Sequence, residues 1–231
     1  MNIIVTGASR GLGRETALVL SEDISNRILI TGRNREELEK TASMAHYRNI
    51  MAVVYDLTGR ITPPENFYSE IKSQFHGIDI LLNNAGSIAS KPFTELSDEE
   101  ARYLMEINFF APAGLIKALF PIMNRGAHIL NISSMGGFQG SAKFPGLSYY
   151  SASKAALASL TECLAVEFKE AGIFVNCLAP GSFQTEMLNE AFPGYEAPVS
   201  AKDMGRFVAY FAVNGHKFFN GKILPIALTN P

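Results

Sequence analysis

A glycine cluster that directly follows a short apolar run constrains this chain more than any other feature of its sequence. The run Asn2–Thr6 is rich in β-branched residues and has the length of a buried parallel strand. Gly7, Gly11 and Gly13 come next, followed by a segment with apolar residues at helical spacing. A strand, a glycine turn and a helix in this order form the unit that holds a dinucleotide. The sequence therefore predicts a nucleotide site near its first residues.

Each glycine of this turn has a separate physical role. Gly7 permits a tight turn, Gly11 lets the backbone approach a pyrophosphate, and Gly13 lets the helix pack closely on the strand, with the helix N-terminus facing the anion. The spacing Gly-x-x-x-Gly-x-Gly differs from the usual G-x-G-x-x-G fingerprint. A glycine-rich turn without a ligand is the alternative, but its place directly after the first strand favours a nucleotide. We predict that the cofactor is bound here by Thr6, Gly7, Ser9, Arg10, Gly11, Leu12 and Gly13.

Strand-like and helix-like segments alternate along the rest of the chain. Further strands are predicted over 27–31, 51–55, 78–82, 127–132, 173–178 and 222–226. Helices are predicted over 35–46, from Ser97 toward Ile122 with an interruption at Pro112, and over 148–171 with Gly172 as the C-cap. This alternation predicts one α/β domain over residues 1–231. We expect a doubly wound, Rossmann-type parallel sheet of about seven strands with helices on both faces.

Composition narrows the class of protein. The chain has 231 residues, of which 47% are hydrophobic, and its formal net charge is −2. Because it has no basic block, we expect neither a nucleic-acid partner nor an anionic membrane surface. The apolar stretch 109–123 is broken by Pro112, Lys117 and Pro121, so no membrane span is expected, and no signal peptide is evident. These features predict a cytoplasmic protein.

Cysteine and histidine usage predicts no metal centre. Cys163 and Cys177 both sit inside apolar patterns, which favours core packing in a reducing compartment over a disulfide or a metal site. The four histidines are scattered and form no ligand cluster.

Tyr150 and Lys154 form a second motif with chemical meaning. Residues four positions apart on a helix project from the same face. An ammonium group near a phenol favours the phenolate, so we expect Lys154 to lower the pKa of Tyr150 from its usual ~10. Such a phenol can donate and accept protons near neutral pH. A tyrosine and a lysine at this spacing also occur by chance, so the pair gains weight only in combination with other motifs.

Several patterns follow one another in a fixed order and together resemble the short-chain dehydrogenase/reductase family, in its compact single-domain branch. They are Thr6-Gly7-x-x-x-Gly11-x-Gly13, Asp56-Leu57, Asn83-Asn84-Ala85-Gly86, Asn108, Ser134, Tyr150-x-x-x-Lys154 and Pro180-Gly181-x-x-x-Thr185. The resemblance covers essentially the whole chain. It implies a nicotinamide-dependent oxidoreductase whose active site lies at the carboxyl ends of the strands.

The resemblance also implies catalytic roles. Tyr150 would be the general acid in reduction and the base in oxidation, while Lys154 would lower the pKa of Tyr150 and bind the nicotinamide ribose. Ser134 would hold the substrate oxygen; its neighbour Ser133 competes for this role and is otherwise a strand-end hydroxyl bonded to backbone. Asn108 would hold a water that links Lys154 to solvent, or cap a helix irregularity, and the two roles are compatible.

Charge at the end of the second strand predicts the cofactor. Enzymes that prefer NAD usually end this strand with an acidic residue that binds the ribose hydroxyls. Here Gly32 takes that position and Arg33 follows it, while Arg10 lies inside the glycine turn. Two guanidinium groups without an acid suit a 2′-phosphate, unless both arginines are simply solvated. We therefore expect NADP(H) to be preferred, with NAD(H) possible.

The resemblance assigns the remaining cofactor contacts. The adenine would meet Asp56 and Leu57, and the adenosine ribose would lie over Asn84, Ala85 and Gly86. The carboxamide would be held near Pro180, Gly181 and Thr185.

The chain departs from the family pattern beside the expected substrate site. Ser134 and Tyr150 are 16 positions apart (150 − 134), a few more than is usual in the family. The extra residues fall near 142–147, and the segment 183–199 carries apolar residues suited to a lid: Met187, Leu188, Phe192 and Tyr195. The C-terminus lacks the usual acid-Gly-Gly ending, which makes a homodimer more plausible relative to a homotetramer. The partner is expected to be a small carbonyl or alcohol, whose identity and physiological direction stay open.

Two other functions remain as alternatives. A nucleotide-binding sensor or scaffold could keep the fold without turnover, although it would need no proton relay. A sugar epimerase or dehydratase of the extended branch would use a different glycine spacing and a larger substrate domain.

Overall fold

Seven parallel strands form one sheet in the computed structural model, which describes residues 1–59 and 65–228. The sheet order is β3-β2-β1-β4-β5-β6-β7, so the strand order reverses between β1 and β4. The strands are β1 Asn2–Thr6, β2 Arg27–Gly32, β3 Ile50–Val54, β4 Ile78–Asn83, β5 Met123–Ile132, β6 Phe174–Pro180 and β7 Ile223–Ile226. The predicted doubly wound α/β fold is confirmed. The domain predicted over 1–231 includes residues 60–64 and 229–231, which lie outside the described residues.

Apolar side chains dominate the central strands because helices cover both faces of the sheet. Along β1, Ile3 and Val5 join one hydrophobic cluster and Ile4 joins the other, and all three are fully buried. The same alternation recurs along β2, where Leu29 faces the cluster of Ile4. Successive side chains of a strand point to opposite faces, so one unbroken apolar run fills two cores.

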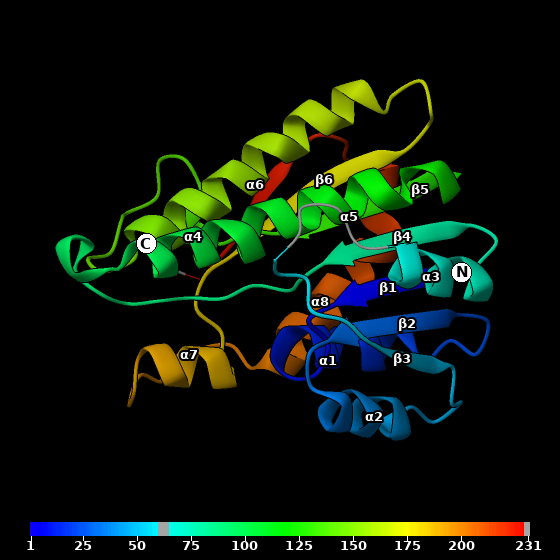
Figure 1. Ribbon diagram of the computed structural model, residues 1–231, viewed down its shortest axis with the longest axis horizontal. Coiled ribbons are helices and arrows are strands. Elements are labelled where there is room, and N and C mark those ends of the chain that lie inside the picture. The colour runs from blue at the N-terminus through cyan, green and yellow to red at the C-terminus, as the bar shows by residue number, and fades with distance from the viewer. Residues whose placement is uncertain (60–64, 229–231) are drawn as a thin grey trace.

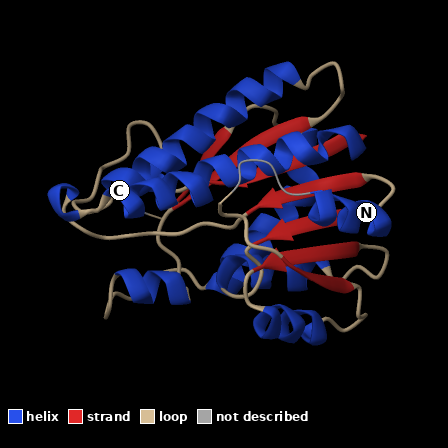
Figure 2. Ribbon diagram, viewed as in Figure 1, coloured by secondary structure: helices blue, strands red, loops and turns tan. Residues whose placement is uncertain are grey.

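Helices form a layer on each side of the sheet (Figures 1 and 2). One face is covered by α1 Gly11–Leu20, α2 Arg35–Met44 and α8 Ala201–Asn214. The other is covered by α3 Glu65–Gln74, α5 Ala111–Leu119 and α6 Ser148–Glu167, with α4 Asp98–Met105 leading into α5. The short helix α7, Glu186–Ala191, lies off the edge of the sheet toward which the strand arrows point (Figure 1). Helices α3, α7 and α8 were not predicted from the sequence.

Two predicted helix starts are confirmed in atomic detail. The side chain of Asn34 accepts a hydrogen bond of 3.2 Å from the backbone N–H of Glu37. Ser97 and Glu100 form a reciprocal capping box. The helical stretch that begins there is interrupted as expected, but the interruption is a π-helix, Glu106–Phe110, which ends just before Pro112.

The end predicted for α6 was wrong by several residues. The helix stops at Glu167, and Gly172 adopts φ +70° in the turn that follows. The N–H of Gly172 donates to the carbonyl of Lys169 at 3.0 Å, and its own carbonyl accepts from Gly126 at 2.7 Å. Gly172 therefore ties this turn to β5, a tertiary contact that local sequence does not specify.

One helical stretch of the described residues, Asp98–Ile122, passes a length and composition test for a membrane span. Its mean hydropathy is 1.2, and 44% of the tested window is buried inside the fold. The sequence expectation concerned an uninterrupted apolar run, and Pro112, Lys117 and Pro121 do interrupt this stretch. The core helix of a soluble protein passes the same test, so the finding is only weak evidence for a membrane contact.

Candidate active site

A pocket of about 880 Å³ opens where the seven strands end. Its lining includes Gly7 after β1, Arg33 after β2, Asn84 after β4, Ser134 after β5 and Gly181 after β6. It therefore spans the point between β1 and β4 where the strand order reverses, the usual ligand site of such sheets. All predicted site residues line this pocket except Thr6, Gly13 and Asn108.

The glycine turn lies against the β4 loop so closely that side chains would not fit. A Cβ atom on Gly13 would lie 2.4 Å from the carbonyl oxygen of Gly7 and 2.5 Å from Nδ2 of Asn84. One on Gly7 would lie 2.7 Å from Cα of Ala85. Gly7 and Gly11 also adopt positive φ angles of 66° and 56°. Gly13 therefore serves helix packing, as predicted, and stays out of the pocket.

Thr6, predicted as a cofactor-binding residue, lies beneath the turn and does not line the pocket. Its side chain is buried, and Oγ1 accepts hydrogen bonds of 3.0 Å from the N–H groups of both Asn84 and Ala85. In return, Nδ2 of Asn84 donates to the carbonyls of Thr6 and Gly7 at 3.0 and 3.1 Å. Thr6 is the last residue of β1, and the hydrogen bonds of its side chain connect β1 to the loop after β4.

The first turn of α1 can accept an anion. Its N-cap residue, Arg10, makes no side-chain capping hydrogen bond, and the turn contains no acidic residue. The N–H groups of a first helical turn have no intrahelical partner, and they lie at the positive end of the helix dipole. Together with the close-packed glycines, this arrangement fits a dinucleotide pyrophosphate.

Where β2 ends, the pocket is lined by Arg33 and not by an acid. Nη1 of Arg33 donates to the hydroxyl of Tyr103 at 3.2 Å, and the arginine is exposed. A Cβ atom on Gly32 would lie 3.7 Å from Oγ of Ser9, so a hydroxyl and a guanidinium flank this position.

Lys154 and Ser133 join α6 to the end of β5. The Lys154 side chain is buried, and its Nζ donates to the carbonyl of Ile132 at 2.8 Å. The hydroxyl of Ser133 donates to the carbonyl of Lys154, also at 2.8 Å. The hydroxyl of Ser134 hydrogen-bonds the Tyr150 phenol and accepts from the N–H of Gly136 at 3.2 Å. Ser133 is thus engaged with backbone, while Ser134 faces Tyr150 in the pocket.

The electrostatics of Tyr150 differ from the sequence expectation. Burial raises the pKa of Tyr150 above its ordinary value, and the hydrogen bond from Ser134 opposes this only in part. Burial also lowers the pKa of Lys154 to about 8, partly offset by Cys177. The expected lowering of the Tyr150 pKa by Lys154 was wrong for this structure, because desolvation dominates and the ammonium is directed to Ile132.

Asn108 sits behind the pocket, inside the π-helix, and is fully buried. Its Oδ1 accepts from the N–H of Ser87, and its Nδ2 donates to the carbonyl of Ser87, both at 2.9 Å. Nδ2 also donates to Oγ of Ser153 at 3.0 Å. A Cβ atom on Gly86 would lie 2.8 Å from Oδ1 of Asn108 and 3.1 Å from Nζ of Lys154. Asn108 therefore holds the β4 loop against α6, beside the lysine.

The remaining predicted residues lie at the pocket, and several have structural partners. Oδ1 of Asp56 accepts from both the N–H and the hydroxyl of Thr58, at 3.0 and 2.8 Å, while Leu57 is buried. The N–H of Gly181 donates to the carbonyl of Ile226 at 2.8 Å. The hydroxyl of Thr185 accepts from the N–H of Leu188 at 3.1 Å and so caps α7.

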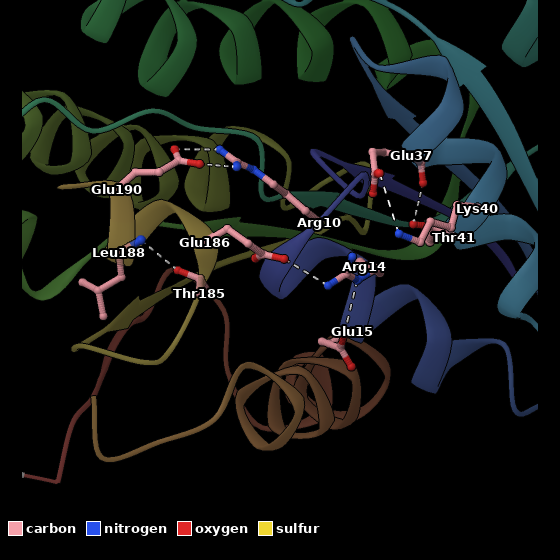
Figure 3. Close-up of polar contacts among 10 residues, drawn as sticks. All are labelled: Arg10, Arg14, Glu15, Glu37, Lys40, Thr41, Thr185, Glu186, Leu188 and Glu190. Atoms are coloured by element: carbon pink, nitrogen blue, oxygen red, sulfur yellow. Dashed lines mark hydrogen bonds and ion pairs between the residues drawn. The ribbon is translucent and has the colours of Figure 1, made fainter. Parts of the chain in front are cut away.

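Two acidic residues at the site were missed by sequence reasoning. Both oxygens of Glu190 pair with the two terminal nitrogens of Arg10, and Glu186 pairs with Arg14 at 3.1 Å (Figure 3). The sequence does contain a matching charge pattern, because the two arginines are four residues apart and so are the two glutamates. Only the fold shows that these two segments, far apart in the sequence, face each other.

The cysteines agree with expectation only in part. Cys177 is buried, and burial raises the pKa of its thiol to about 12, whereas Cys163 is exposed, contrary to its predicted place in the core. Among the described residues, no cluster of three or more histidine, cysteine or acidic side chains could hold a metal ion.

Comparisons with known proteins agree with this geometry. The chain matches the family model of short chain dehydrogenases over residues 1–196. Dehydrogenase/reductase SDR family member 7B of Rattus norvegicus is 34% identical over 197 residues, which cover 80% of this chain and 58% of that protein. An uncharacterized oxidoreductase of Staphylococcus aureus strain MW2 is 27% identical over 90% of this chain and 88% of its own length. The chain thus spans just over half the length of the rat relative.

Solved structures extend the comparison. A dehydrogenase/reductase from Sinorhizobium meliloti 1021 has a TM-score of 0.84 at 30% identity, covering 97% of this chain and 92% of its own. A 3-ketoacyl-(acyl-carrier-protein) reductase from Brucella melitensis, solved in complex with NADH, has a TM-score of 0.85 over 97% of this chain and 96% of its own. At 22% identity, the latter shows the shared fold alone. Since the family match extends over most of its 231 residues, the chain belongs to the short-chain dehydrogenase/reductase family of oxidoreductases.

Proposed function

We propose that this protein is an NADP(H)-dependent oxidoreductase that reduces a carbonyl to an alcohol, or catalyses the reverse reaction. The observation that carries the proposal is the Tyr150 phenol, hydrogen-bonded to Ser134 in the pocket, with the buried ammonium of Lys154 one helical turn away. A proton donor and a second hydroxyl that meet at one pocket suit a reacting carbonyl oxygen.

The site fits a nicotinamide cofactor. The glycine turn with Ser9, Gly11 and Leu12 would hold the pyrophosphate, and Arg10 in the same turn would join Arg33 at a 2′-phosphate. The adenine would meet Asp56 and Leu57, and the adenosine ribose would lie over Asn84, Ala85 and Gly86. The nicotinamide ribose would be held by Tyr150 and Lys154, and the carboxamide by Pro180, Gly181 and Thr185. When bound, the reduced nicotinamide supplies the hydride that reaches the carbonyl carbon.

The protein's own residues would handle the proton. Tyr150 gives its proton to the substrate oxygen, and Ser134 stabilises the charge that develops there. The raised pKa of Tyr150 keeps the phenol protonated at neutral pH, which suits reduction. Asn108 positions the loop beside Lys154 and would support proton return from solvent, the fourth member of the relay.

NADP(H) is favoured over NAD(H) by the charges at the ribose end. Gly32 supplies no carboxylate to bind ribose hydroxyls or repel a 2′-phosphate, and the exposed Arg33 lines the same end of the pocket. A guanidinium suits a phosphate in charge and geometry.

An apolar, neutral carbonyl compound fits the rest of the pocket. The extra residues between Ser134 and Tyr150 contribute Phe144 and Leu147, and the segment around α7 contributes Met187, Leu188, Phe192 and Tyr195. Among the described lining residues of these two segments, the single charged side chain is Glu186, which pairs with Arg14. A substrate carboxylate or phosphate would find no cation there.

We also propose that the protein is cytoplasmic and forms homodimers or homotetramers. The faces around α4 and α6 are the proposed contacts, where Val166 on α6 is 75% exposed. Light scattering of the purified protein gives its mass in solution, and a monomer at micromolar concentration would contradict the oligomer.

The central test is NADPH oxidation against a panel of apolar ketones and aldehydes, with Tyr150→Phe as the variant. Loss of the proton donor is expected to lower kcat about 100- to 10,000-fold, with a much smaller effect on NADPH binding, because the other proposed contacts to the cofactor are kept. Tyr149→Phe is the matched control, because Tyr149 stacks on Phe93 at 5.8 Å and does not line the pocket. Equal activity of Tyr150→Phe and wild type would contradict the mechanism. Nucleotide binding without turnover of any carbonyl would instead favour a sensor or scaffold.

A further inference from the structure

Two ion pairs join the glycine turn and the start of α1 to α7 (Figure 3), and one residue of each pair, Arg10 and Glu186, lines the pocket. Arg10 and Glu190 form a bidentate ion pair, in which Nη2 of Arg10 lies 3.0 Å from Oε2 of Glu190. Nη2 of Arg14 lies 3.1 Å from Oε1 of Glu186. The two arginines are four positions apart in the sequence, and so are the two glutamates. This spacing corresponds to about one helical turn. α7 is therefore docked by charge on the element proposed to bind phosphate.

Glu186 also lies next to the proposed pyrophosphate position. Its Oε2 is 3.6 Å from the place that a Cβ atom on Gly11 would occupy. Gly11 is the first residue of α1, whose first-turn N–H groups attract an anion. A carboxylate at this position disfavours a second anion, since two like charges a few ångströms apart repel each other.

Glu190 would compete with a different phosphate. It engages both terminal nitrogens of Arg10, one of the two arginines available to a 2′-phosphate. When both terminal nitrogens of a guanidinium donate to a carboxylate, they cannot form the same bidentate contact with a phosphate.

We propose that Glu186 and Glu190 are specificity-determining residues whose carboxylates compete with the cofactor phosphates, Glu186 at the pyrophosphate position and Glu190 at Arg10. The inference rests on the proposed function, because it takes the nucleotide site as given. NADP(H) then binds by exchanging two carboxylates for phosphates and releasing α7 from the glycine turn. NAD(H) exchanges only Glu186, because it has no 2′-phosphate to take Arg10 from Glu190.

The two acids therefore have separable effects on binding. Glu190→Gln is expected to lower the dissociation constant of NADPH about three- to fivefold, the range for releasing a partner from an exposed ion pair, and to leave that of NADH unchanged. Glu186→Gln is expected to lower both constants by a similar factor, because both nucleotides carry the pyrophosphate.

The measurement is a fluorescence titration of wild type and each variant with NADPH and with NADH, without substrate. Glu39→Gln is the matched control, since Glu39 pairs with Arg35 at 3.5 Å on α2 and its side chain is 62% exposed, as is that of Glu190. In an Arg10→Gln background, Glu190→Gln should no longer affect NADPH binding.

The outcomes separate this inference from the proposed function. Wild-type protein that binds neither nucleotide would overturn both. Wild-type binding with an unchanged or lowered NADPH preference in Glu190→Gln would overturn the role of Glu190 alone. No change for either nucleotide in Glu186→Gln would overturn the role of Glu186.

Discussion

The Nζ atom of Lys154 lies 2.8 Å from the carbonyl oxygen of Ile132, the last residue of β5. The adjacent Ser133 returns a hydrogen bond to the backbone of Lys154. These two bonds fix α6 on the end of the sheet, so Lys154 is positioned by the protein itself. The ammonium is nevertheless buried, and this has consequences for stability.

Replacing Lys154 with methionine should remove a pH dependence of folding. Burial lowers the pKa of Lys154 to about 8, from its ordinary value of 10.5. Between these values the unfolded chain binds more protons than the folded one, so the free energy of unfolding of wild type should rise with pH by on the order of 3 kcal/mol. Urea unfolding of both proteins from pH 7.5 to 10 measures the difference. Parallel curves would contradict the prediction, and Lys40→Met on α2 should behave as wild type.

His128 should make the fold sensitive to acid. It is fully buried, with Nδ1 2.8 Å from the carbonyl of Ala212 and Nε2 3.1 Å from Nδ2 of Asn176, which is the pattern of a neutral ring. Burial lowers its pKa to about 4 from 6.5. Stability present above pH 6.5 should therefore be lost as the pH falls toward 4, by on the order of 3 kcal/mol.

The comparison is between wild type and His128→Gln, unfolded with urea at several pH values from 7 to 4. The variant should show a shallower decline than wild type. His46→Gln, at an exposed position, is the control and should keep the full decline. A decline in His128→Gln as steep as that of wild type would exclude His128 as its cause.

Arg33→Asp should shift cofactor preference toward NAD(H). The substitution removes a guanidinium from the ribose end of the pocket and adds a carboxylate that repels a 2′-phosphate. The ratio of kcat/KM for NADPH over NADH is expected to fall about 100-fold, the worth of a charge-assisted contact. Arg35→Asp, two residues on and paired with Glu39, should leave the ratio unchanged. An unchanged ratio in Arg33→Asp would refute the assignment.

Gly13→Ala should destabilise the fold, although Gly13 does not line the pocket. The new methyl group would lie 2.4 Å from the carbonyl oxygen of Gly7 and 2.5 Å from Nδ2 of Asn84. Overpacking against backbone is expected to cost about 1–3 kcal/mol and to lower the melting temperature. At Gly32 the nearest atoms would be 3.6 Å away, so Gly32→Ala is the control and should cost less. Similar losses in both variants would mean that close packing at Gly13 is not the cause.

The sequence predicted most of the sheet because buried parallel strands leave a local signature. The runs over 27–31 and 127–132 are mostly apolar, and both lie within observed strands. Helix starts at Asn34 and Ser97 were predictable for the same reason, since a cap acts over three residues. The end of α6 was not predictable in this way, because the turn at Gly172 is held by a hydrogen bond from Gly126 on β5.

Within the candidate site, the sequence predicted which residues gather but not what they do to one another. Spacing places Tyr150 and Lys154 on one helical face, yet the direction of the Tyr150 pKa depends on burial, which only the packed structure determines. Thr6 and Asn108 were expected to serve a ligand or a water, and only the structure shows that both also hold neighbouring loops through hydrogen bonds.

By itself the sequence determined the α/β class, the glycine turn and the tyrosine–lysine spacing, because each depends on residues close together in the chain. The tertiary structure alone decided that Arg10 and Arg14 meet Glu190 and Glu186, more than 170 positions away. It also decided that the Lys154 ammonium points to Ile132. Charge pairing and desolvation depend on distances in space, and these are set only when β1, β5 and β6 bring their carboxyl ends to one edge of the sheet.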